Sequence, residues 1–214
     1  MDSARHGRIH RPARRTLLRG GAALGLAAMA AAVPAAAATA QPRSRPEWGR
    51  PRAEWIPANP ANYTVSNRPS SYPVQLVVVH VTQETYADTL AIFQNPARSV
   101  SAHYVVRSAD GHLAQMVRDK DIGWHAGNWN YNTRSIGIEH EGWVDQPEWF
   151  TDAMYRTSAA LTAAICAEHG IHVNRTNIIG HHEVPGATHT DPGPLWDWDR
   201  YMGLVRAAGA RARS

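Results

Sequence analysis

Histidine and aspartate side chains are concentrated in one turn-rich stretch of the sequence, residues 178–194. This stretch holds three histidines and one aspartate, namely His181, His182, His189 and Asp191. Histidine nitrogens and aspartate oxygens are ligands that zinc takes in proteins. The prolines and glycines around them indicate a loop rather than a helix. Because two ligands at positions 181 and 191 leave the set incomplete, the stretch predicts a zinc site that another element completes.

The third ligand is predicted to be His80, which ends the most hydrophobic run of the chain, residues 74–80. A continuous run of β-branched residues is typical of a strand buried on both faces, and sites are often built at strand ends. We therefore predict that His80, His181 and Asp191 bind Zn²⁺ and leave a fourth position for water, as in catalytic zinc sites. His182 is the rival ligand, but in an extended segment its side chain points away from that of His181.

A second predicted strand, residues 135–141, carries a carboxylate whose direction can be inferred. Alternation places Ile136, Ile138 and His140 on one face, and the two isoleucines mark this as the core face. Glu139 therefore projects from the opposite face. A carboxylate in this position is either a solvated surface group or a general base beside a metal, and the zinc hypothesis favours the base.

Aromatic and amide side chains are concentrated in the loop predicted over residues 124–132. Rings stack on the apolar faces of sugars, and amides hydrogen-bond to hydroxyl and carbonyl groups. We therefore predict that Trp124, His125, Asn128 and Trp129 form a substrate groove wall. The alternative is a loop that its own tryptophans fold onto the core.

The remaining elements follow from capping and turn residues. Helices are predicted over residues 85–95, 151–169 and 198–210, and a hairpin is predicted over 101–117 around Asp110-Gly111. His103 in the first hairpin strand is interpreted as a packing residue, and support of the metal site is the alternative. At 214 residues the chain has room for one ordinary domain.

The first forty residues have the pattern of a twin-arginine export signal. A basic segment, Arg14-Arg15-Thr16-Leu17-Leu18-Arg19, precedes an uncharged, alanine-rich run and the sequence Ala38-Thr39-Ala40 at a predicted cleavage site. The apolar run is shorter than the ~20 residues that span a bilayer, so no stable membrane insertion is expected after cleavage. Residues 41–73 are rich in proline and are interpreted as an extended arm.

The leader also accounts for the basic character of the chain. The formal net charge is +4, and residues 1–40 contribute six arginines and one aspartate, so removing their +5 leaves about −1. This balance argues against a nucleic-acid partner. Cys166 is the only cysteine, which excludes an internal disulfide and a cysteine-based zinc site. We expect a monomer.

Five short motifs occur in an order that is characteristic of one protein family. They are Val77-Val78-Val79-His80, Ser101-Ala102-His103-Tyr104, Trp124-His125-Ala126-Gly127, Ser135-Ile136-Gly137-Ile138-Glu139, and Gly180-His181 through Thr190-Asp191-Pro192-Gly193-Pro194. With these motifs, residues 74–200 closely resemble the zinc-dependent N-acetylmuramoyl-L-alanine amidases of the amidase-2 family. That family shares its fold with phage amidase lysozymes and peptidoglycan recognition proteins.

The resemblance implies a fold and a set of roles. It implies a single α/β domain over residues 74–210, with a central mixed sheet flanked by helices. The family's zinc ligands correspond to His80, His181 and Asp191, and its catalytic glutamate corresponds to Glu139. His189 stands where the family often has a lysine, and we assign it a role at the oxyanion or the leaving group. The implied substrate is peptidoglycan or a muropeptide, cleaved between N-acetylmuramic acid and L-alanine.

Two other functions are compatible with the same motifs. One is a non-catalytic peptidoglycan-binding module, as some recognition proteins are. A complete set of metal ligands together with Glu139 argues against this alternative, because binding alone requires neither. The other is a peptidase that cuts further along the stem peptide.

Overall fold

A mixed six-stranded sheet forms the centre of the computed structural model, which describes residues 49–211. Its strands, in spatial order, are β1 (Glu54–Trp55), β5 (Leu113–Gln115), β4 (Tyr104–Val106), β7 (Ser135–His140), β3 (Leu76–Val81) and β8 (Ile178–Gly180). The strands β4, β7, β3 and β8 are parallel, whereas β5 runs antiparallel to β4. A separate two-stranded sheet joins β2 (Tyr63–Thr64) to β6 (Ile122–Gly123). The predicted α/β domain with a mixed sheet is confirmed.

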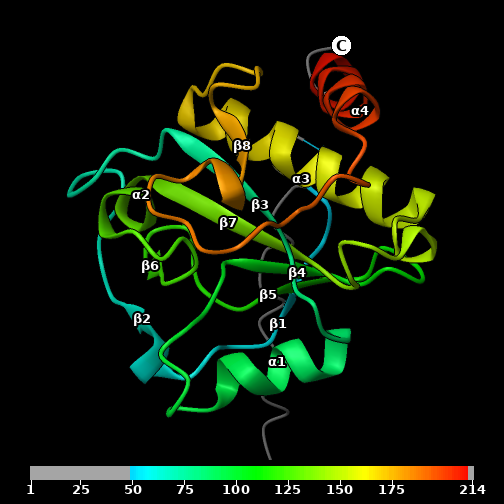
Figure 1. Cartoon of the computed structure of the whole chain (residues 1–214). Coiled ribbons are helices and arrows are strands. Elements are labelled where there is room, and N and C mark those ends of the chain that lie inside the picture. Colours follow the sequence, from blue (N-terminus) through cyan, green and yellow to red (C-terminus); the bar gives the residue numbers. More distant parts are fainter. Residues whose placement is uncertain (1–48, 212–214) are drawn as a thin grey trace, which may run out of the picture. The chain divides into compact units, whose positions relative to one another are not determined.

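Helices cover both faces of the main sheet. The helices are α1 (Tyr86–Gln94), α2 (Trp129–Arg134), α3 (Asp152–His169) and α4 (Trp198–Arg211), and short 3-10 turns lie at Pro60–Asn62, Pro147–Trp149 and His181–Glu183. Helices α3 and α4 lie on one side of the sheet, and α1 lies on the other (Figure 1). Thr151 caps the first turn of α3, and Gly170 ends the helix with a left-handed φ of 66°.

Strand β3 is buried along its whole length because both of its faces are covered. Val77, Val79 and Val81 belong to the apolar cluster that includes residues of α3 and α4. Leu76 and Val78 face the opposite side. By alternation His80 also points to this second side, which is the side of α1. The continuous apolar run therefore marks a strand buried on both faces, as predicted.

The other elements predicted from the sequence are present, with one correction. The hairpin forms between β4 and β5, and α1, α3 and α4 occupy the predicted ranges. Residues 124–132 are not one loop, because residues from Trp129 onward form helix α2. Asn128 caps this helix by accepting a hydrogen bond from the Tyr131 amide, a capping signal within the amide-rich segment. The predicted export signal, residues 1–40, lies outside the described residues.

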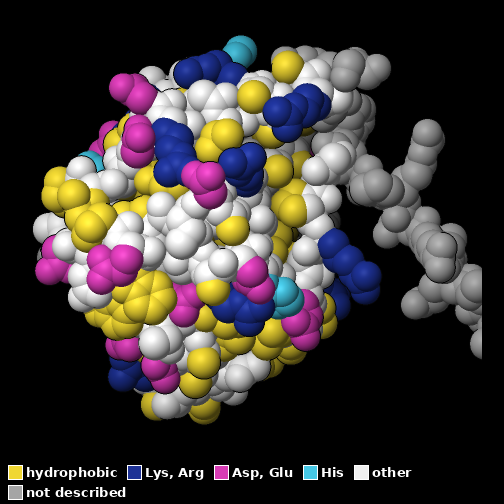
Figure 2. All heavy atoms as spheres, turned by 90° about the vertical axis from the view of Figure 1, so that its right-hand side faces the viewer, with side chains coloured by type: hydrophobic (Ala, Val, Ile, Leu, Met, Phe, Trp, Pro, Cys, Tyr) yellow, Lys and Arg dark blue, Asp and Glu magenta, His cyan; other side chains and the backbone are white. Residues whose placement is uncertain are grey.

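The described part of the predicted arm, residues 49–73, is paired with the domain. Strand β1 adds to the edge of the main sheet beside β5, and β2 pairs with β6. Trp55 is 46% exposed and lies under the guanidinium of Arg118. On the face that Figure 2 shows, basic and acidic side chains are interspersed. Among the helices of residues 49–211, none has both the length and the apolarity needed to cross a bilayer.

Arg68 anchors this arm in the interior. Its guanidinium is almost fully buried and donates hydrogen bonds to the backbone carbonyls of Asp119, Asp121, Thr133 and Ser135 at 2.5–3.2 Å. A buried cation is tolerated only when its donors are satisfied, and here backbone carbonyl groups of the loop at residues 119–121 and of the junction between α2 and β7 satisfy them. Through Arg68, the arm therefore connects this loop to the end of α2 and the start of β7.

Replacing Arg68 with alanine should lower the free energy of unfolding by about 3 kcal/mol, since several buried carbonyls would lose their donor. Urea unfolding of the two proteins measures the difference. The control is Arg52→Ala, because Arg52 lies in the same arm but is exposed, and its removal should cost less than about 0.5 kcal/mol. An unfolding midpoint unchanged by Arg68→Ala would contradict this assignment.

His103 packs beside Arg68 and is buried with its ring neutral. Its Nδ1 accepts a hydrogen bond from the Gly137 amide at 3.0 Å, and its Nε2 lies 2.7 Å from the Arg68 guanidinium. Burial, reinforced by the charge of Arg68, lowers the pKa of His103 to about 3. The described contacts are those of a packing residue.

In the unfolded chain the pKa of His103 is expected to be ~6.5, and in the folded chain it is lower. The neutral ring therefore contributes its full stabilisation only above about pH 6.5. This contribution should be lost as the pH falls from about 6.5 towards 3. Between pH 7 and 5, the stability advantage of the parent over His103→Asn should shrink by on the order of 2 kcal/mol. Urea unfolding at both pH values measures it, and an advantage independent of pH would contradict the neutral state.

Candidate metal centre

His80, His181 and Asp191 converge at the carboxyl ends of two adjacent parallel strands. His80 is near the end of β3, and His181 directly follows β8, whose Gly180 pairs with Val79. Parallel pairing places these strand ends at the same edge of the sheet. Nδ1 of His80 lies 3.2 Å from one oxygen of Asp191, and Nδ1 of His181 lies 3.0 Å from the other. The structure thus brings the predicted trio together, with ligand atoms within 4.8 Å of one another.

The trio is buried, and its donor chemistry suits zinc. Each of the three residues has at most 6% of its surface exposed. Burial alone would raise the pKa of Asp191, but its contacts with the rings of His181 and His80 outweigh burial and hold that pKa well below its usual range. Two imidazole nitrogens and an ionised carboxylate form a ligand set that leaves a tetrahedral ion one open position.

His182, the rival ligand, points away from this trio. Its backbone amide donates to the carbonyl of Asp191 at 3.0 Å, and its Nδ1 lies 3.1 Å from the same oxygen. These contacts fasten the loop back onto the end of β8. His182 therefore holds Asp191 through the backbone, whereas His181 approaches it through the side chain.

A second group of acidic and histidine side chains within residues 49–211 is already neutralised. Asp119, Glu168 and His169 lie close enough to share an ion. However, Arg50 forms ion pairs with both carboxylates, at 2.8 Å to Glu168 and in closer contact with Asp119. Because the guanidinium supplies the positive charge, this cluster does not require a metal.

Glu139 stands beside His80 at the site. The two residues pair in register between β3 and β7, so their side chains leave the sheet on the same face. One carboxylate oxygen of Glu139, Oε2, is buried without a hydrogen-bond partner in the described part of the chain. Burial, followed by the negative charge of Asp191, raises the pKa of Glu139 well above its usual range. An orphaned carboxylate oxygen with a raised pKa is suited to exchanging a proton.

The trio and Glu139 open into a cavity of about 290 Å³. His125 and His189 also line it, and the His189 ring stacks on that of His181 with centroids 5.0 Å apart. The remaining wall comes from residues that the sequence had not indicated, including Gln83, Ile92, Phe93, Arg98 and Val100. Ile92 and Phe93 belong to α1, so the helix contributes to the groove as well as to the core.

Of the four residues predicted to form the groove wall, His125 alone is among those that line this cavity. Trp124 donates a hydrogen bond from its indole nitrogen to Thr64. Asn128 caps α2 and donates to the carbonyl of Pro185. Trp129 is 53% exposed at the start of α2. The contacts of Trp124 and Asn128 fit the alternative interpretation, in which this segment folds onto its own domain.

His140 supports the site from the other face of the sheet and was not predicted to do so. Its Nδ1 donates to the backbone carbonyl of His80 at 2.7 Å, and its Nε2 accepts a hydrogen bond from Ser158 of α3 at 2.6 Å. The Ser158 hydroxyl contacts Tyr201 of α4 at 2.9 Å. The sequence signal that could have indicated this role is a histidine on the core face of a strand, because a buried polar group requires partners.

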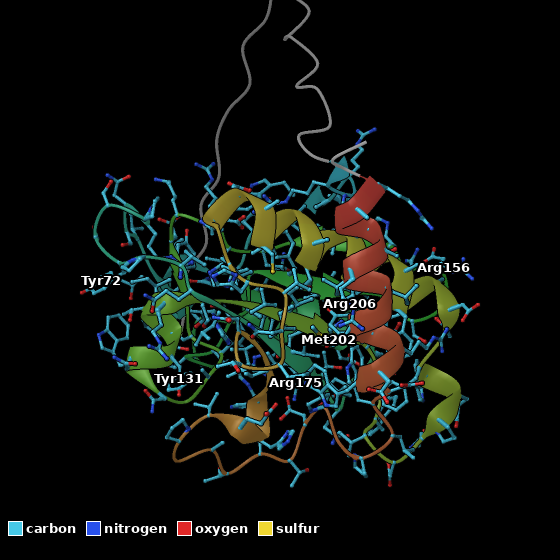
Figure 3. All side chains as sticks on the ribbon, turned by 90° about the horizontal axis from the view of Figure 1, so that it is seen from above. Tyr72, Tyr131, Arg156, Arg175, Met202 and Arg206 are labelled. Atoms are coloured by element: carbon cyan, nitrogen blue, oxygen red, sulfur yellow. The ribbon has the colours of Figure 1, made fainter. Side chains whose placement is uncertain are left out.

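The loop after β8 is braced from outside by Arg175. This residue, labelled in Figure 3, lies between α4 and the loop that carries His181. Its guanidinium donates to the carbonyl of Ile178, pairs with Glu183 and covers the Trp198 ring. Glu183 in turn accepts from the Gly180 amide at 2.6 Å, which fixes the backbone immediately before His181.

Comparison with known proteins agrees with this geometry. Residues 70–194 match the family described as N-acetylmuramoyl-L-alanine amidase. The chain belongs to this amidase family. It is 36% identical over 175 residues to N-acetylmuramoyl-L-alanine amidase A of Achromobacter lyticus, covering 73% of this chain and 95% of that protein. It is also 38% identical over 112 residues to the 1,6-anhydro-N-acetylmuramyl-L-alanine amidase AmpD of Escherichia coli, covering 50% of this chain and 58% of AmpD.

Solved structures show the same amidase fold. A selenomethionine derivative of AmpD superposes with a TM-score of 0.60 at 31% identity, covering 74% of this chain and 97% of that structure. The Staphylococcus aureus hydrolase AmiA, solved with its ligand, gives a TM-score of 0.61 at 16% identity, over 74% of this chain and 83% of that structure. At this lower identity the likeness concerns the fold alone.

Proposed function

We propose that this protein is a zinc-dependent N-acetylmuramoyl-L-alanine amidase that hydrolyses the amide bond between N-acetylmuramic acid and L-alanine in peptidoglycan. The observation that carries the proposal is the convergence of His80, His181 and Asp191 beside the unpartnered carboxylate of Glu139. Membership of the amidase family supplies the reaction class and the substrate class.

The two histidines and the aspartate would hold the ion. When bound, zinc supplies Lewis acidity, which polarises an amide carbonyl and lowers the pKa of water to near ~7. Asp191 contributes the negative charge that favours a divalent cation. His80 and His181 contribute neutral nitrogens, and their rings lie 4.6 Å apart between centroids.

Glu139 would act as the general base. Its position in the cavity next to His80 allows Oε2 to accept the proton of the attacking water. Its raised pKa makes the carboxylate a better proton acceptor than an exposed glutamate. The same group can then deliver the proton to the amine of L-alanine, so that one carboxylate serves both halves of the hydrolysis.

His189 would assist at the carbonyl oxygen or the leaving amine. It lines the cavity and stacks on His181, which places it beside the trio without adding it to the ligand set. A histidine at this position can donate a hydrogen bond from neutral or protonated imidazole. Its assignment rests on this placement and on the resemblance to a family that often has lysine there.

We infer that the protein acts outside the cytoplasm. The support is the twin-arginine pattern, the alanine-rich run and the predicted cleavage site within residues 1–40. A protein exported by this route would meet peptidoglycan directly, which agrees with the proposed substrate. A monomer with one groove suffices for this activity.

Chelation and product analysis test the function. Purified wall treated with the protein should release stem peptides with a free N-terminal L-alanine, identified by mass spectrometry. Activity should fall to background after chelation and return when zinc is restored, because the trio then regains its ion. Binding of wall without release would indicate a binding module, and cleavage within the stem would indicate a peptidase; either result would overturn the proposal.

Glu139→Gln tests the base. The glutamine has nearly the same shape but accepts no proton, so kcat should fall roughly 10²–10⁴-fold while zinc affinity stays close to that of the parent. The matched control is Glu148→Gln on the exposed turn at Pro147–Trp149, which should retain parental kcat. Wild-type turnover by the Glu139 variant would remove this residue from the mechanism.

A further inference from the structure

The His125 ring is locked against the candidate ligand His80. His125 is 5% exposed, and its Nδ1 lies 2.9 Å from Nε2 of His80 with the two rings nearly perpendicular, at 88°. On its other side, Nε2 of His125 lies 3.2 Å from the hydroxyl of Ser135. Both nitrogens are therefore engaged within the protein, which leaves neither free to bind substrate.

These contacts determine where the protons lie. The Ser135 hydroxyl donates its one proton to the carbonyl of Tyr131 at 2.5 Å, since a carbonyl can only accept. Ser135 must therefore accept from His125, which places the proton of neutral His125 on Nε2 and leaves Nδ1 bare. Bare Nδ1 accepts from Nε2–H of His80. The Nδ1 of His80 is then unprotonated and faces Asp191 at 3.2 Å.

We propose that His125 is a positioning residue that holds His80 in the tautomer whose bare Nδ1 faces the cation site. This inference rests on the proposed function. It replaces the substrate-contact role that the aromatic and amide-rich segment suggested. A metal-binding histidine commonly donates its second ring proton to a fixed acceptor, and here the acceptor is another histidine, itself oriented by Ser135.

The surroundings of His125 are shaped for this ring. A Cβ atom on Gly137 would lie 2.5 Å from Cγ of His125, so the ring occupies the space that any larger residue at 137 would fill. The side-chain oxygen of Asn132 accepts from the amides of His125 and Ala126 at 3.1 and 2.8 Å, which fixes the backbone. The ring is thus held by packing, by its backbone and by both nitrogens.

Two substitutions separate an acceptor role from a space-filling role. His125→Asn retains an oxygen near the position of Nδ1 and should bind zinc within a few-fold of the parent. His125→Leu fills the space without an acceptor and should weaken zinc binding about 10–100-fold. Competition with a chromogenic chelator measures both affinities. Nitrogen-15 NMR of the metal-free proteins should show His80 protonated at Nε2 in the parent and in His125→Asn, but not uniformly in His125→Leu.

Equal zinc affinity in all three proteins, or equal losses in both variants, would overturn the inference, and so would an unchanged His80 tautomer in His125→Leu. If the leucine variant does not fold, Ser135→Ala provides the second test, since it removes the acceptor that sets the His125 proton and should disturb the same NMR signals. A parent protein that binds no zinc would refute the proposed function, whereas the tautomer measurement would still decide the role of His125.

Discussion

The parallel pairing of β3 with both β7 and β8 is the constraint on which the site depends. The register with β7 places Glu139 beside His80, and the register with β8 ends at Val79 and Gly180, immediately before His181. A shift by one residue would turn His80 or Glu139 to the opposite face of the sheet. The same register buries the valines of β3, so the hydrophobic core selects the alignment that assembles the site.

The free-energy cost of burying polar groups at this site is offset by hydrogen bonds on both faces of the sheet. On the α1 face, the His80 ring contacts His125. On the α3 face, the His80 carbonyl accepts from His140, which continues through Ser158 to α4. Because buried donors and acceptors must be paired, the helices position the ligand strand as well as covering it.

Hydrogen bonds from the arm also hold the edge of the cavity. Asn62 is fully buried, its amide nitrogen donates to the carbonyls of Phe93 and Asn95, and its side-chain oxygen accepts from Ser99. These bonds hold the turn after α1, where Ser99 adopts a positive φ of 52° and Arg98 reaches the cavity. The arm, which precedes β3, thus supports the edge of the cavity as well as forming the edge of the sheet.

The sequence by itself determined the strand buried on both faces, the capped helices, the hairpin and the ligand candidates His80, His181 and Asp191, because periodicity, capping and ligand chemistry are local properties. The face of Glu139 also followed from alternation. The tertiary structure alone decided that residues 129–134 form a helix, that His125 contacts a ligand, and that His140 and α1 belong to the site. Those relationships join segments distant in the chain, so they depend on strand order and packing that no local pattern specifies.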